Sequence, residues 1–252
     1  MENLIVGKNI VKTFGLEGHS RNVLDGVSID VSEGEFVSVM GPSGSGKTTL
    51  MFALSGLDSV DSGNILFNGR DYTSLKKNEQ ADLLRRDIGF VFQQPTLLKN
   101  LNILDNIILP SVKDNRKEVG KYREKALSLM KKMGIAGLEN RDITEVSGGE
   151  LQRAGICRAL LNSPKIIFGD EPTGALNSKT SHEIMEIFSE INDGGTAVLL
   201  VTHDAKVASR TERILFMKDG KIVSQMHFEK RSALSAEDRM NQILSKMREI
   251  GI

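Results

Sequence analysis

The sequence is poor in cysteine and has no long apolar run. Its 252 residues include one cysteine, Cys157, so no internal disulfide can form and we expect a reducing, cytosolic environment. No apolar run approaches the ~18–20 residues that span a bilayer. Met1-Glu2-Asn3 also lacks the basic start of a secretory signal. The composition therefore predicts a soluble chain that reaches a membrane only through a partner.

The chain has no formal net charge at pH 7, because its 33 Lys and Arg residues are balanced by 33 Asp and Glu residues. Without a basic surplus, nothing argues for a nucleic-acid partner, and we expect none. There is no internal repeat and no sustained heptad pattern. The 39% of hydrophobic residues suffice for a core, and the length suits one large domain or a domain with a sub-lobe.

The first third of the chain is predicted to be rich in β-strands. Short apolar segments alternate there with turn signals such as Glu33-Gly34 and Asn68-Gly69. The predicted strands are Asn3–Val11, Val27–Val31 and Asn64–Phe67. We expect them to form an antiparallel front of the fold.

Helices and strands alternate in the remainder. Apolar residues recur at helical spacing from about Asn115 to Met133, which predicts a helical sub-lobe, with bounds of about 90–163. Predicted strands at 165–169, 197–202 and 214–217 then alternate with predicted helices at 178–192 and 204–209. This alternation predicts an α/β fold with a mostly parallel core sheet. We expect a main domain of residues 1–228 and an amphipathic helical extension at 229–252.

One loop carries the strongest functional signal. Gly41-Pro42-Ser43-Gly44-Ser45-Gly46-Lys47-Thr48 fits the phosphate-binding loop template G-x-x-x-x-G-K-[ST] at every constrained position. A buried strand is predicted before it, and an apolar helix that includes Thr49 after it. Backbone N–H groups and the helix N-terminus would hold phosphates, Lys47 would reach the β- and γ-phosphates, and Thr48 would ligate Mg²⁺. The sequence therefore predicts a P-loop NTPase.

Two carboxylates end a predicted strand in Ile166-Ile167-Phe168-Gly169-Asp170-Glu171. Ligands of open α/β folds bind at the carboxyl edge of the sheet, so both side chains are expected at the nucleotide. Asp170 would hold Mg²⁺, and Glu171 would polarise a water for attack on the γ-phosphate. A solvated Asp-Glu pair is the alternative interpretation for this motif alone.

A third motif distinguishes between kinds of P-loop protein. Val146-Ser147-Gly148-Gly149-Glu150 resembles the signature sequence of ATP-binding-cassette (ABC) ATPases. Phe92-Gln93 resembles their Q-loop, Gly174-Ala175-Leu176-Asn177 their D-loop, and Val201-Thr202-His203-Asp204 their switch-histidine loop. The motifs occur in the family's order, and the resemblance covers roughly residues 3–225.

The resemblance implies a head-to-tail homodimer that binds two ATP molecules. In that arrangement Ser147, Gly148, Gly149 and Glu150 would face the ATP held by the P-loop of the other copy. Gln93 would ligate Mg²⁺, and Phe14 would stack on adenine. His203 would contact the γ-phosphate and the attacking water, and would act with Lys47 and Glu171 in catalysis.

Each of the lesser sites has a plainer interpretation. Ser147 and Glu150 also form an S-x-x-E capping box, so they would start a helix whether or not they bind nucleotide. His203 and Gln93 are ordinary loop residues if taken alone, and Phe14 an ordinary aromatic. Cys157 is assigned to packing. The apolar residues just after Gln93 predict either a permease-binding groove or a core strand: Leu97, Leu98, Leu101, Ile103 and Leu104.

The sequence departs from the family pattern at two positions. Glu150 stands where glutamine is usual and places a carboxylate near the nucleotide of the other copy, although a first helical turn tolerates negative charge. Asn177 replaces the usual D-loop aspartate, and the lost charge puts tight coupling between the two sites in doubt.

Within the family, the motifs and the tail are most similar to bacitracin-type peptide-resistance exporters, in the branch that includes macrolide exporters and lipoprotein-releasing ATPases. That implies a separate integral membrane permease, a position on the cytoplasmic face of the membrane, and a possible two-component sensor kinase acting through the permease. The absent heptads argue against DNA-repair ATPases, and the single motif set against two-cassette translation factors. A cell-division type ATPase that signals mechanically stays open, because a cargo path would lie in the other chain.

Overall fold

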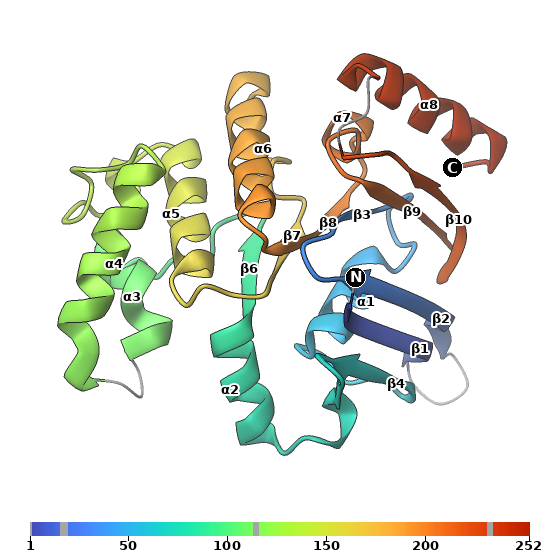
Figure 1. Ribbon diagram of the computed structural model, residues 1–252, viewed down its shortest axis with the longest axis horizontal. Coiled ribbons are helices and arrows are strands. Elements are labelled where there is room, and N and C mark those ends of the chain that lie inside the picture. The colour runs from blue at the N-terminus through green and yellow to red at the C-terminus, as the bar shows by residue number, and fades with distance from the viewer. Residues whose placement is uncertain (1, 16–19, 113–115, 231–233) are drawn as a thin grey trace.

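The computed structural model describes residues 2–15, 20–112, 116–230 and 234–252. The described residues form two sheets, one with strand order β2-β1-β4-β5 and one with order β10-β9-β3-β8-β7-β6. Figure 1 shows the smaller sheet beside one end of the larger one and a group of helices at the other end. The predicted α/β class is confirmed.

The smaller sheet is antiparallel and corresponds to the predicted front. It consists of β1 (Asn3–Phe14), β2 (Arg21–Ser32), β4 (Ser62–Phe67) and the short β5 (Arg70–Asp71). Ile10 of β1 pairs with Val27 of β2, and both are buried. The three predicted strands are present, and each begins earlier or ends later than its apolar pattern indicates because pairing continues through polar residues.

The larger sheet is mostly parallel. Its strands are β3 (Phe36–Met40), β6 (Ile88–Phe92), β7 (Ile166–Asp170), β8 (Ala197–Thr202), β9 (Arg213–Lys218) and β10 (Lys221–His227). Only the β9–β10 pair is antiparallel. Every residue of β3 and β8 is buried, as expected for parallel strands covered on both faces. The carboxyl ends of β3, β7 and β8 therefore meet at one edge.

Helix α1 (Lys47–Ser55) fills the space between the two sheets. Its buried Leu50 and Leu54 belong to the same core as Ile5 of the front and Phe168 of the parallel sheet. Helices α2 (Lys77–Asp87), α6 (Ser178–Asp193) and α7 (Ala205–Ala208) connect the strands. Single 3-10 turns in the described part of the chain occur at Tyr72–Ser74, Arg116–Glu118 and Ile143–Glu145.

Three further helices form a group beyond β6: α3 (Ile103–Val112), α4 (Val119–Lys132) and α5 (Gly148–Leu160). They share a core in which Ile107, Met130 and Cys157 are fully buried. The expected helix start near Asn115 lies outside the described residues, and α4 itself begins at Val119.

The apolar cluster after Gln93 is not a core strand. Ile103 and Leu104 are buried at the start of α3, whereas Leu98 is 48% exposed in the loop before it. The buried Asn106 side chain holds that loop, because its Oδ1 accepts from Leu98 N at 2.6 Å and its Nδ2 donates to Leu98 O at 3.0 Å. The alternative of a core strand was wrong, because these residues lie in a loop and in the first turn of α3 rather than in a strand.

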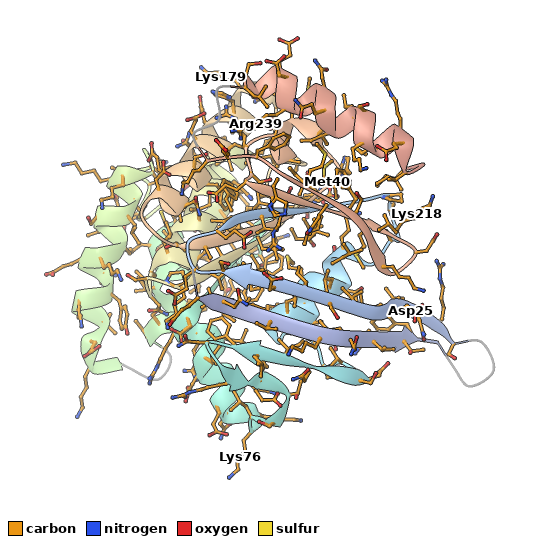
Figure 2. All side chains as sticks on the ribbon, turned by 45° about the vertical axis from the view of Figure 1, so that its right-hand side comes forward. Asp25, Met40, Lys76, Lys179, Lys218 and Arg239 are labelled. Atoms are coloured by element: carbon orange, nitrogen blue, oxygen red, sulfur yellow. The ribbon has the colours of Figure 1, made fainter. Side chains whose placement is uncertain are left out.

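The tail folds back on the domain. Helix α8 (Ala236–Glu249) buries Ile243 against a core formed by α7 and β9. Figure 2 labels Arg239 on this helix and Lys218 near its far end. Lys218 Nζ donates to Ile250 O at 3.3 Å and to Gly251 O at 3.0 Å. Within the described ranges, no helix is both long and apolar enough to cross a membrane.

Candidate nucleotide-binding site

The loop between β3 and α1 is pressed against two neighbouring strands. Gly46 has φ of 99°, and a Cβ there would lie 2.5 Å from Val23 O of β2. A Cβ at Gly41 would collide with Met217 O of β9. Glycine is therefore required at both positions, and the loop backbone is free to approach a ligand closely.

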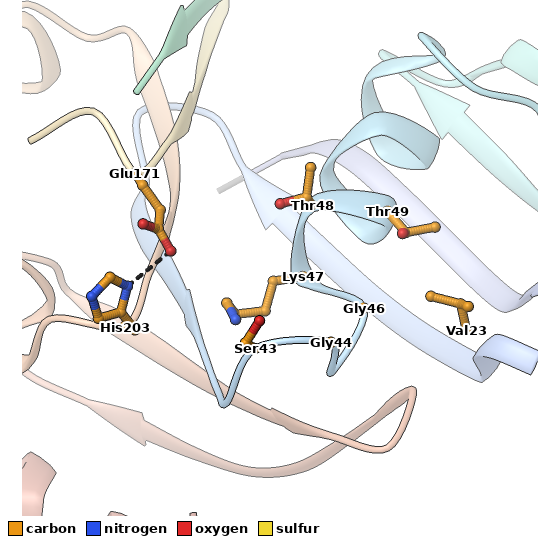
Figure 3. A pocket seen from close by; sticks show the side chains of 9 residues that line it. All are labelled: Val23, Ser43, Gly44, Gly46, Lys47, Thr48, Thr49, Glu171 and His203. Atoms are coloured by element: carbon orange, nitrogen blue, oxygen red, sulfur yellow. Dashed lines mark hydrogen bonds and ion pairs between the residues drawn. The ribbon is translucent and has the colours of Figure 1, made fainter. Parts of the chain in front are cut away.

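A cavity of about 710 Å³ opens above this loop, a size suited to a nucleotide. Figure 3 shows the residues that line it. They are Val23, Ser43, Gly44, Gly46, Lys47, Thr48, Thr49, Glu171 and His203. Ser45 Oγ is buried in the loop without a hydrogen-bond partner in the described part of the chain. An orphaned hydroxyl and a glycine cradle at a helix N-terminus fit a phosphate group.

Lys47 is held in place by the loop itself. Its Nζ donates to Gly41 O and to Pro42 O, both at 2.9 Å, and the residue is only 8% exposed. Burial lowers the pKa of Lys47, whereas the charges of Glu171 and Asp170 act to raise it. A cation in such a poorly hydrated position attracts phosphate oxygens more strongly than one in bulk water.

Thr48 and Asp170 come together from α1 and β7. Thr48 Oγ1 donates to Asp170 Oδ1 at 3.0 Å. Burial raises the pKa of Asp170, and the Thr48 hydrogen bond opposes that shift. The described residues contain no group of three or more His, Cys, Asp or Glu side chains suited to a metal. One carboxylate and one hydroxyl fit Mg²⁺, which takes few protein ligands and completes its shell with water and substrate phosphates.

Glu171 and His203 form a pair at the edge of the sheet (Figure 3). Glu171 Oε1 lies 2.8 Å from His203 Nδ1. Because a carboxylate accepts hydrogen bonds, Nδ1 is the donor in this contact, which leaves the other ring nitrogen, Nε2, for a ligand. Glu171 has φ of 46°, a left-handed conformation that is uncommon for glutamate and typical of functional sites.

Gln93 lies close to this pair without lining the cavity. A Cβ placed on Gly174 would lie 2.9 Å from Gln93 Nε2 and 3.3 Å from Glu171 Oε2. The end of β6 and the loop after β7 therefore bring both side chains to the same face of Gly174.

The signature residues Ser147, Gly148, Gly149 and Glu150 do not reach the cavity of their own chain. They form the N-terminus of α5, where Ser147 is the N-cap and is exposed. The predicted capping box is present, with Ser147 Oγ accepting from Glu150 N at 3.4 Å. The helix-capping interpretation therefore holds for the isolated chain.

Phe14 also lies outside the cavity lining. Its ring is 49% exposed at the end of β1, and Lys12 Nζ lies 5.3 Å from the ring centroid. An exposed ring with one face near a cation remains available for stacking on a flat ligand.

Sequence reasoning missed Gln152. It is 1% exposed, and its Nε2 donates to Phe92 O at 3.0 Å and to Pro172 O at 2.8 Å. It thus joins α5 to the residue before Gln93 and to the loop after Glu171. An amide four residues before the apolar Ile156, on the buried face of α5, was the available signal.

The fold and the cavity together define a P-loop nucleotide-binding protein of the ATPase kind. The family model described as ABC transporter matches residues 24–174. The chain belongs to the ABC transporter family, as an ATP-binding cassette, and the resemblance found in the sequence is confirmed.

Curated relatives include proteins of export systems. The chain is 40% identical to the bacitracin export ATP-binding protein BceA of Halalkalibacterium halodurans, covering 89% of this chain and 88% of BceA. It is 43% identical to the ABC transporter ATP-binding protein YknY of Bacillus subtilis, covering 85% of this chain and 93% of YknY. It is 40% identical to the macrolide export ATP-binding/permease protein MacB of Chlorobaculum tepidum, over 85% of this chain. The matched region is 33% of the length of MacB, so the chain corresponds to only part of that protein.

Solved cassettes share the fold. A dimeric, post-hydrolysis structure of the ATP-binding cassette MJ0796 with ADP and Pi matches with a TM-score of 0.83 and 37% identity, covering 90% of this chain and 99% of that one. The ADP-bound cassette MJ1267 matches with a TM-score of 0.82 and 26% identity, covering 100% and 98%.

Proposed function

We propose that this chain is the ATP-hydrolysing subunit of an exporter of antimicrobial peptides or antibiotics. The observation that carries the ATPase assignment is the convergence of Lys47, Glu171 and His203 on one nucleotide-sized cavity. The names of the relatives BceA and MacB support the export of antibiotics. The proposed ATPase domain is residues 1–228 with a sub-lobe of about 90–163, and the extension at 229–252 braces that domain through α8.

Hydrolysis would depend on position more than on covalent chemistry. Glu171 would orient the attacking water, and His203, held by Glu171 through Nδ1, would turn its other ring nitrogen toward the γ-phosphate and donate a hydrogen bond to it from Nε2–H. Lys47 and the P-loop amides would bind the phosphates. Thr48, Asp170 and Gln93 would hold Mg²⁺, which neutralises charge on the β- and γ-phosphates when bound. Phe14 would stack on adenine.

A second copy would complete each site. The signature at the start of α5 does not line the cavity of its own chain, and Ser147 and Gly148 are exposed. The similarity to a dimeric cassette bound to ADP and Pi supports a dimer in which Ser147, Gly148 and Gly149 face the triphosphate of the other copy.

The permease would dock in a groove beside β6. The groove has a volume of about 310 Å³, and its lining includes Phe90 and Phe92 of β6, Pro110 of α3 and Leu57 of the loop after α1. Phe90 and Phe92 stack with centroids 5.9 Å apart, and Leu57 is 47% exposed. Such an apolar face fits a cytoplasmic segment of an integral membrane permease, which would hold the chain at the cytoplasmic face of the membrane and connect it to a two-component sensor kinase.

The variant Glu171→Gln tests the ATPase assignment. We expect ATP binding to persist, turnover to fall by about 10²–10⁴-fold, and a nucleotide-bound dimer to accumulate. Glu186→Gln is the matched control, since Glu186 also lies beside a histidine, His182, but outside the cavity. Hydrolysis by Glu171→Gln at the parent rate would show that another group orients the water.

A further inference from the structure

The Ser147 hydroxyl is already engaged in the isolated chain. Glu150 Oε2 accepts from Ser147 Oγ at 2.7 Å and from Ser147 N at 2.7 Å. These hydrogen bonds lower the pKa of Glu150, so its carboxylate is ionised at neutral pH. The single hydroxyl hydrogen of Ser147 therefore points at an anion of its own chain.

The same contact places a negative charge at the N-terminus of α5. The helix N-terminus carries a partial positive charge that favours one nearby anion. In the proposed dimer, the γ-phosphate of the other copy needs both that helix end and the Ser147 hydroxyl. In the structure, the Glu150 carboxylate lies at that helix end and accepts the hydrogen bond of the Ser147 hydroxyl. A glutamine at this position would accept the same hydrogen bond without a negative charge.

We propose that the Glu150 carboxylate competes with the γ-phosphate of the other copy's ATP for the Ser147 hydroxyl. The carboxylate must release Ser147 before two copies close around ATP. Residue 150 therefore sets the ATP concentration needed for dimerisation. The inference rests on the proposed dimer, and it adds a residue that controls closure rather than binding to the P-loop. Glu150 is absent from the lining of the cavity, so the first binding of ATP to one chain is independent of it.

The chain contains a natural control at its other end. In α8, Ser235 Oγ donates to Asp238 Oδ2 at 2.7 Å, and Asp238 N donates to Ser235 Oγ at 3.0 Å. This capping box repeats the geometry of Ser147 and Glu150 on a helix outside the nucleotide site. Asp238→Asn therefore removes the same kind of helix-capping charge without removing a competitor of phosphate.

The experiment measures ATP-induced dimerisation by analytical ultracentrifugation in a Glu171→Gln background, where turnover is slow. With Glu150→Gln added, we expect the ATP concentration for half-maximal dimerisation to fall by about five- to tenfold, the difference between a charged and a neutral hydrogen-bond acceptor. Fluorescent ATP bound to single chains at high dilution should show an unchanged Kd. Added NaCl should reduce the difference in half-maximal ATP concentration between the proteins with and without Glu150→Gln, because salt screens the repulsion between the Glu150 carboxylate and the phosphate.

Two further variants separate charge from folding. Glu150→Asp keeps the anion and should dimerise at the ATP concentration of its parent. Asp238→Asn should also dimerise at the ATP concentration of its parent, and it should change the melting temperature about as much as Glu150→Gln does. Equal dimerisation curves for Glu150→Gln and its parent would overturn the inference, as would an equal shift caused by Asp238→Asn.

Failure of the proposed function gives a different result. If the Glu171→Gln chain binds ATP and forms no dimer at any ATP concentration, the dimer itself is wrong. If that chain dimerises but Glu150→Gln does not change the ATP concentration for half-maximal dimerisation, the proposed dimer is supported and the competitor role of Glu150 is wrong.

Discussion

Glu171 Oε1 and His203 Nδ1 lie 2.8 Å apart, across the ends of the neighbouring strands β7 and β8. The contact exists because Asp170 pairs with Val201 in register, which places the next residues of both strands at one edge of the sheet. A carboxylate that would orient water and a histidine that would sense the γ-phosphate are thus in direct contact.

This pair predicts that His203→Ala lowers the ATPase rate by about 10²-fold or more, with ATP binding largely unchanged. The reason is that Glu171 loses the partner that fixes its side chain, and the γ-phosphate loses a contact. Steady-state hydrolysis and equilibrium binding check the prediction. His182→Ala is the control, because His182 lies between Glu186 and Arg210 outside the cavity. Equal activity of the two variants would assign His203 to structure alone.

Asn177 is the N-cap of α6, and its Oδ1 accepts from Thr180 N at 2.9 Å. Aspartate makes the same cap, so Asn177→Asp should fold with a similar melting temperature. We expect the added charge to change the ATPase rate or its cooperativity in ATP while nucleotide still binds. An unchanged steady-state profile would remove any regulatory meaning from the asparagine.

The groove beside β6 predicts which surface changes release the permease. Leu57→Asp, in the lining of the groove, and Leu98→Asp, two residues after Thr96 of that lining, should abolish co-purification with the permease while ATP binding persists. Both side chains are exposed, so little folding energy depends on them. Val223→Asp is the control, because Val223 is 46% exposed on the distant strand β10. Retention of the permease by both leucine variants would exclude this face as the docking site.

Cys157 predicts how alkaline pH acts on the fold. Burial raises the pKa of its thiol to about 12, above the unfolded value of about 8.5. The neutral thiol is favoured in the fold, so its contribution to stability is complete below about pH 8.5 and is lost as pH rises toward 12. Native protein should react with iodoacetamide at least ~10³-fold more slowly than denatured protein. Comparable rates would show that the α5 core is open.

Local patterns were enough to predict the P-loop, the strand before it and the two carboxylates. Each of these depends on a short run of sequence whose chemistry constrains the residue types, such as Gly46, which lies against Val23. Strand ends were less well predicted, since β7 continues to Asp170 by pairing with β6 and β8.

What escaped prediction depends on contacts between distant segments. Gln152 joins α5 to Phe92 and Pro172, and no local pattern near residue 152 specifies those partners. The separation of buried Leu104 from exposed Leu98 likewise depends on Asn106, whose side chain shapes the loop. The position of α8 over α7 and β9 could not be read from its amphipathic pattern, which fits a partner equally well.

The central claim is that each chain supplies half of each ATPase site, and a mixing experiment tests it most directly. Lys47→Ala disables the P-loop, and Gly148→Asp disables the signature at an exposed position where a side chain meets no close neighbour. Each variant alone should be inactive. A 1:1 mixture should recover up to about a quarter of the parent rate, because half of the dimers are mixed and each mixed dimer has one intact site of two. Full activity of Gly148→Asp alone, or a mixture no more active than its parts, would contradict the account.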